Sequence, residues 1–117
     1  MAKATITLPY PNKPSQYGMN AYYSGKHWSV RKRDADWWHR MVVSETPWHR
    51  PPLKSPVRIE FYWNDRLDLS NHAMMAKFIE DGLKGRVIVD DSRKHVAEIV
   101  HRWHREKFIK VIVEEIK

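Results

Sequence analysis

The 117-residue chain carries 21 lysines and arginines against 14 aspartates and glutamates, which gives a formal net charge of +7. Its 42% hydrophobic content excludes a disordered chain, its length excludes two independent cores, and the absence of cysteine excludes disulfides and thiolate zinc sites. We expect a single domain over residues 1–117 with a polyanionic partner. The sequence shows neither a membrane-length apolar run nor a signal peptide, so we expect a cytoplasmic protein.

The N-terminal half predicts one strand and one helix. Residues 3–8 alternate and are rich in β-branched side chains, which is typical of a strand, and prolines then begin an extended loop over residues 9–27. Ser29 is a candidate N-cap for a helix that begins at Val30, with Trp38 and Val42 on its apolar stripe. Four prolines between residues 47 and 56 indicate a connection.

The C-terminal half predicts three strands and a second helix. Residues 57–63 read as a half-buried strand, and the apolar spacing over residues 70–83 predicts a helix closed by Gly82 and Gly85. A short apolar run follows at residues 87–89. Residues 96–103 and 107–116 are predicted to form a hairpin with its turn near Arg105 and Glu106. The order β-α-β-α-β-β indicates a small α+β fold with a mixed or antiparallel sheet and two helices.

An acidic segment stands out in this basic chain. Asp68-Leu69-Ser70-Asn71 is followed by Lys77, Asp81 and the pair Asp90-Asp91. Ionised carboxylates surrounded by lysine and arginine are what a hydrolase needs to hold a hard cation against a phosphodiester. Taken alone, each aspartate is more often a helix cap or turn residue, and Lys77 with Asp81 is better explained as an i,i+4 salt bridge.

The order of these residues resembles the signature of the RusA family of Holliday junction resolvases. The match runs through Asp68-Leu69-Ser70-Asn71, Lys77, Glu80-Asp81-Gly82-Leu83 and Val89-Asp90-Asp91-Ser92. The N-terminal half agrees more loosely, through residues 6–11, Asn20 and residues 26–28 with Arg31 and Arg33. The resemblance implies a RusA-like homodimer, from a bacterial cell or its phage, that uses Mg²⁺ or Mn²⁺ to cut four-way DNA junctions with paired symmetric nicks.

The resemblance also implies roles for single residues. Asp68 matches the first metal-binding aspartate, Asp91 the essential member of the late pair and Asp90 its companion, while Lys77 matches the catalytic lysine. Two departures weaken the match: Ser70 replaces a second aspartate, and Lys77 lies about one helical turn further along the chain. Asp81, Asp65 or a water is then needed to replace the lost ligand.

Basic and polar residues elsewhere are candidates for binding DNA phosphates, with an ordinary solvated surface as the alternative for each. The candidates are Asn20, Lys26, His27, Arg31, Arg33, Arg40, Asn71 and Arg93. Tyr22, Tyr23 and Trp28 could stack on unpaired bases, although aromatic residues in so small a domain more often belong to the core. His101 and His104 lie three apart on a predicted strand and so point to opposite faces, which argues against a zinc site.

Two other functions fit the same residues. Because Ser70 removes a carboxylate, the chain could be a catalytically weak or silent module that binds branched DNA. It could also be a metal-dependent nuclease for other branched nucleic acids, such as flaps, replication forks or RNA.

Overall fold

Four strands form one mixed sheet in the order β1–β4–β2–β3, in a computed structural model that describes residues 2–116 apart from the Tyr23 side chain. The strands are β1 (Lys3–Leu8), β2 (Val57–Trp63), β3 (Val96–Trp103) and β4 (Ile109–Glu115). β4 is antiparallel to both of its neighbours, whereas β2 and β3 are parallel. The α+β fold with a mixed sheet is therefore confirmed.

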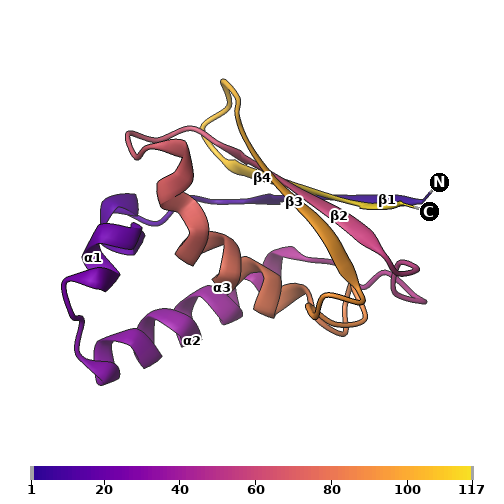
Figure 1. Ribbon diagram of the computed structural model, residues 1–117, viewed down its shortest axis with the longest axis horizontal. Helices are drawn as coiled ribbons and strands as arrows, with labels where there is room; N and C mark the ends of the chain where they lie inside the picture. Colours follow the sequence, from indigo (N-terminus) through magenta and orange to yellow (C-terminus); the bar gives the residue numbers. More distant parts are fainter. Residues whose placement is uncertain (1, 117) are drawn as a thin grey trace.

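The helices lie on one side of this sheet (Figure 1). They are η1 (Pro14–Tyr17), α1 (Met19–Tyr23), α2 (Trp28–Glu45), η2 (Leu69–His72) and α3 (Ala73–Leu83), where η denotes a 3₁₀ helix. The β2 side chains Val57, Ile59, Phe61 and Trp63 are buried toward the helices and alternate with partly exposed residues. No helix in the described part of the chain is long and apolar enough to cross a membrane.

The predicted helices needed three corrections. The segment over residues 9–27 was predicted to be a loop, but it contains η1 and α1, so residues 2–116 contain three α-helices where two were predicted. Helix α2 begins at Trp28, and His27 is its N-cap: its Nδ1 accepts the Ser29 N–H at 3.2 Å, which leaves Ser29 inside the helix. The second predicted helix opens with the 3₁₀ turn η2 before α3 begins.

The predicted hairpin between the last two strands is wrong, because β2 lies between β3 and β4. β2 and β4 both bury every second side chain, so each is best placed in the middle of the sheet, whereas the more exposed β3 is best at the edge. Residues 104–108 then cross the end of β2. The Asn64 side chain holds this crossing by donating to the carbonyls of Arg105 and Glu106 at 3.3 and 3.0 Å.

Helices α2 and α3 touch where a glycine lets them approach. A Cβ on Gly82 would lie 2.6 and 2.7 Å from the Cγ1 and Cβ atoms of Val42. Next to this contact, Trp38 stacks on Phe78 with their ring centroids 6.1 Å apart. The packing of α3 on α2, and with it the placement of the acidic segment, depends on this small residue.

We predict that Gly82→Ala destabilises the protein, although alanine is normally worth about 1 kcal/mol more than glycine inside a helix. The added methyl group has to push the backbone-anchored Cβ of Val42 away, which typically costs about 1–3 kcal/mol. Urea unfolding monitored by tryptophan fluorescence measures the difference. A variant more stable than the wild type would contradict the close approach.

Candidate functional site

Lys77 and Asp91, two residues of the predicted site, are in contact. Lys77 lies on the exposed side of α3, and its Nζ is 2.5 Å from Oδ2 of Asp91, in the turn that leads to β3. The same ammonium is 3.4 Å from Asp81, one helical turn further along α3. Lys84 adds a second ammonium 3.9 Å from Asp81 and 3.6 Å from Asp91. Two carboxylates and two lysines therefore form one cluster.

The charges in this cluster shift one another. The hydrogen bond to Asp91, together with nearby Asp81, raises the pKa of Lys77, and the same hydrogen bond lowers the pKa of Asp91. Burial, opposed by the ammonium of Lys77, raises the pKa of Glu80 to about 7. Both members of the Lys77–Asp91 pair are thus charged at neutral pH, while the buried Glu80 is partly protonated beside them.

The other two predicted metal ligands lie apart from these contacts. Asp68 is the exposed N-cap residue of η2, and only its backbone carbonyl is used, by the N–H of Asn71 at 2.9 Å. Within residues 2–116, the side chains of Asp68 and Asp90 form no hydrogen bond or ion pair, in contrast to those of Asp81 and Asp91. The same residues contain no group of three or more histidine, aspartate or glutamate side chains that could hold a metal ion.

The donor set of the cluster nevertheless suits magnesium. Mg²⁺ in phosphate-processing sites is usually bound by one or two carboxylates, with the remaining positions filled by water and substrate phosphate. Asp81 and Asp91 already converge on one positive charge, the ammonium of Lys77. These two carboxylates are the residues that would hold such an ion.

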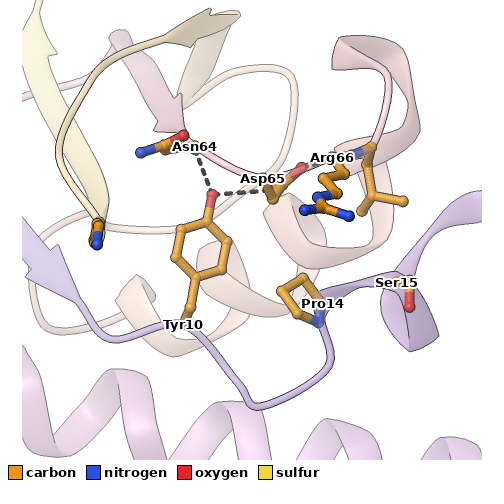
Figure 2. Close-up of a pocket in the computed structure, with 8 residues that line it drawn as sticks. Tyr10, Pro14, Ser15, Asn64, Asp65 and Arg66 are labelled. Carbon is orange, nitrogen blue, oxygen red and sulfur yellow. Dashed lines mark hydrogen bonds between the residues drawn. The ribbon is translucent and has the colours of Figure 1, made fainter.

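Asp65 was considered as a replacement metal ligand, but its carboxylate oxygens already accept hydrogen bonds within the protein. Its carboxylate accepts from the Tyr10 hydroxyl at 2.8 Å, from the Leu67 N–H at 2.9 Å and from Nε2 of the fully buried His72 at 2.9 Å (Figure 2 shows the bond from Tyr10). Nδ1 of His72 lies 2.8 Å from the carbonyl of Leu69. Although burial opposes it, the bonds from His72, Tyr10 and Leu67 lower the pKa of Asp65.

Sequence reasoning missed this hydrogen-bonded group. The Asp65 carboxylate links Tyr10 to the fully buried His72, whose ring stacks on Trp63 with 4.4 Å between ring centroids. The only sequence signal was the position of Asp65 directly after a strand.

Three of the predicted DNA-binding residues make contacts within the protein. Lys26 pairs with Asp34 at 2.9 Å, donates to the carbonyl of Gln16 and lies over the ring of Tyr22. Arg31 donates to the carbonyls of Lys26 and Tyr22, both at 3.1 Å.

The third, Asn71, accepts the N–H of Met19 at 2.6 Å and so ties the acidic segment to the start of α1. All three join neighbouring segments of the fold.

The remaining candidates are more exposed. His27 caps α2 as described above, and the side chains of Asn20, Arg33, Arg40 and Arg93 are exposed. Arg33 and Arg40 line a shallow depression of about 310 Å³ on α2, together with Lys32 and the partly exposed Trp37. Trp28 is 71% exposed beside His27, whereas Tyr22 is buried and donates to Asp34; the predicted role of the Tyr23 side chain lies outside the described residues.

Comparison of the chain with protein-family models and with curated proteins found no match.

We expect the free energy of unfolding to depend on pH through the ionisation of Asp65. Because its pKa is lowered in the folded protein, its contribution is present at neutral pH and is lost as the pH falls through the folded value. We predict that Asp65→Asn costs about 2 kcal/mol at pH 7 and that this cost shrinks below about pH 4. Urea unfolding at pH 7, 5, 4 and 3 measures it, with Asp36→Asn on the exposed face of α2 as the control. A cost independent of pH would show that the ionised form of Asp65 does not stabilise the fold.

Lys26 should matter for stability more than for DNA binding. Removing its ammonium leaves the buried Asp34 without its cation, so Lys26→Met is expected to lose roughly 2–4 kcal/mol of unfolding free energy. Lys32→Met, on the exposed face of α2, removes the same charge with little effect on stability. Thermal and urea unfolding of the two variants makes the comparison, and equal stabilities would show that the Asp34 contact is unimportant.

Proposed function

We propose that this protein is a magnesium-dependent endonuclease of the RusA type, which cuts four-way DNA junctions by paired symmetric nicks. The observation that carries the proposal is the contact between Lys77 and Asp91. These residues are 14 positions apart, and both belong to the acidic segment whose order of residues resembles the RusA signature. The contact supports the proposal because it brings two residues of that signature together.

The chain's own groups can perform parts of phosphodiester hydrolysis. Asp81 and Asp91 provide the oxygen ligands that would bind Mg²⁺ beside a phosphate. When bound, the ion polarises the phosphate and lowers the pKa of a coordinated water. Lys77, held charged by the two carboxylates, provides positive charge where negative charge develops on the phosphate in the transition state. Asp68, exposed at the start of η2, is the further carboxylate that the resemblance assigns to this site.

The surface charge supports DNA as the substrate. The net charge of +7 favours a polyanion, and the exposed Arg33 and Arg40 on α2 can track its phosphates. A homodimer, which the family resemblance implies, would present two such sites and so cut two strands of one junction. We place this activity in the cytoplasm of a bacterial cell.

Cleavage of a labelled four-way junction tests the proposal. With Mg²⁺ the wild type should make paired, symmetric nicks and should cut the junction in preference to flaps and linear duplex. Asp91→Asn, Asp68→Asn and Lys77→Met should each lower the cleavage rate at least a hundredfold, because each removes charge on which the transition state depends. Glu45→Gln, which removes an exposed carboxylate from the last turn of α2, is the matched control.

Binding measured on the same junction separates the alternatives. Asp91→Asn should bind the junction about as tightly as the wild type while failing to cut it. Junction binding by a wild type that never cuts would instead identify a silent binding module. Equal cleavage by the wild type and Asp68→Asn would show that the site assignment is wrong.

A further inference from the structure

A pocket of about 470 Å³ opens beside the start of the acidic segment, at the end of the sheet where β1 and β2 finish. Three chain segments line it: residues 10–15 after β1, residues 64–67 after β2, and Lys107 from the loop that crosses to β4. Its volume lies within the roughly 300–1,000 Å³ of small-molecule sites. Figure 2 shows Tyr10, Pro14 and the residues after β2 arranged around this space.

Hydrogen bonds fix the walls of this pocket. The Tyr10 hydroxyl donates to Asp65 at 2.8 Å and accepts the N–H of Asn64 at 2.6 Å, so the ring is held in place (Figure 2). The Asn64 side chain in turn holds the loop that carries Lys107, through the carbonyls of Arg105 and Glu106. A pocket organised in this way loses little conformational entropy when a ligand enters.

The pocket combines an apolar wall with cations at its rim. The ring faces of Tyr10 and Pro14 and the side chain of Leu67 provide flat or apolar surface. Arg66 and Lys107 are exposed, and within residues 2–116 neither forms an ion pair or a side-chain hydrogen bond. Among the lining residues Asp65 is acidic, and its carboxylate already accepts hydrogen bonds from Tyr10 and the Leu67 N–H.

We propose that this pocket binds one unpaired nucleotide of a DNA strand, with the base against Tyr10 and Pro14 and its flanking phosphates at Arg66 and Lys107. A base offers a flat apolar face that stacks on aromatic rings, and phosphates are the anions that free arginine and lysine side chains attract. The inference rests on the proposed function in one respect, that the partner is DNA. Beyond the proposed function, the inference names the part of a branched DNA that this pocket contacts: a base that lies outside the duplex.

The experiment compares two fluorescein-labelled duplexes of one sequence, one of them with a single unpaired adenosine, by fluorescence anisotropy in EDTA. The wild type should bind the bulged duplex roughly tenfold more tightly, the effect expected from stacking one base. Arg66→Ala combined with Lys107→Ala should bring this ratio close to one. Ser15→Trp, which fills the pocket from the start of η1 without changing the charge, should do the same while binding the plain duplex normally.

A matched control removes two lysines at the other end of the sheet. Lys3→Ala combined with Lys54→Ala should weaken binding to both duplexes equally and leave the ratio unchanged. Equal binding of both duplexes by the wild type, or a ratio that survives in a folded Ser15→Trp variant, would overturn the proposal. Competition by free deoxyadenosine monophosphate as strong as that by the bulged strand would also overturn it, because the site would then take mononucleotides.

These outcomes are independent of cleavage. The binding assay contains no magnesium, so a protein that fails to cut junctions can still show the preference for an unpaired base. Conversely, a protein that cuts junctions with equal affinity for the two duplexes would keep the proposed function and lose only this pocket assignment.

Discussion

The contact between Asp65 and the buried His72 holds the loop after β2 against the start of the acidic segment. Asp65 follows β2, Tyr10 reaches it from the exit of β1, and His72 joins it to the turn at Leu69. Removing either side chain would leave polar groups of the other without a hydrogen-bond partner, which is costly for a buried group. The position of Asp68 and the shape of the pocket beside it both depend on this arrangement, because Asp65 and Leu67 belong to the same short loop.

The cluster of Lys77, Asp81, Lys84 and Asp91 differs from Asp65 and His72 because it lies at the surface. Lys77 and Lys84 balance the charges of Asp81 and Asp91. The neighbouring Glu80 is buried, and its pKa is raised. Exposed pairs of this kind contribute little to stability.

The strands were predictable from sequence because their signal is local. Alternation at residues 3–8, 57–63 and 96–103 gave strands with these same bounds, and the apolar stripe gave the positions of α2 and α3 to within a turn. The order of strands in the sheet was not predictable. Adjacency in sequence suggested that β3 and β4 form a hairpin, but β2 pairs with both and lies between them. Pairing is a property of the whole sheet, and no short segment encodes it.

The site was predictable to a similar extent. The sequence placed Lys77, Asp81 and Asp91 in one predicted site together with Asp68 and Asp90. The contact between Lys77 and Asp81 follows from their helix spacing, whereas the contact of Lys77 with Asp91 depends on how the chain turns after α3. The internal roles of Lys26, Arg31 and Asn71 were missed, because their partners Asp34, Tyr22 and Met19 are brought near only by the turns around α1. A basic residue looks the same in a sequence whether it faces solvent or a carbonyl.

The pairing of β1 with β4 affects how the protein can be made. Lys3 lies opposite Glu114, so the two ends of the described chain meet at one edge of the sheet (Figure 1). During synthesis on the ribosome, β1 and β2 cannot form their hydrogen bonds to β4 until β4 has emerged. The sheet is therefore completed late, and the emerging chain presents unpaired strands to chaperones in the meantime.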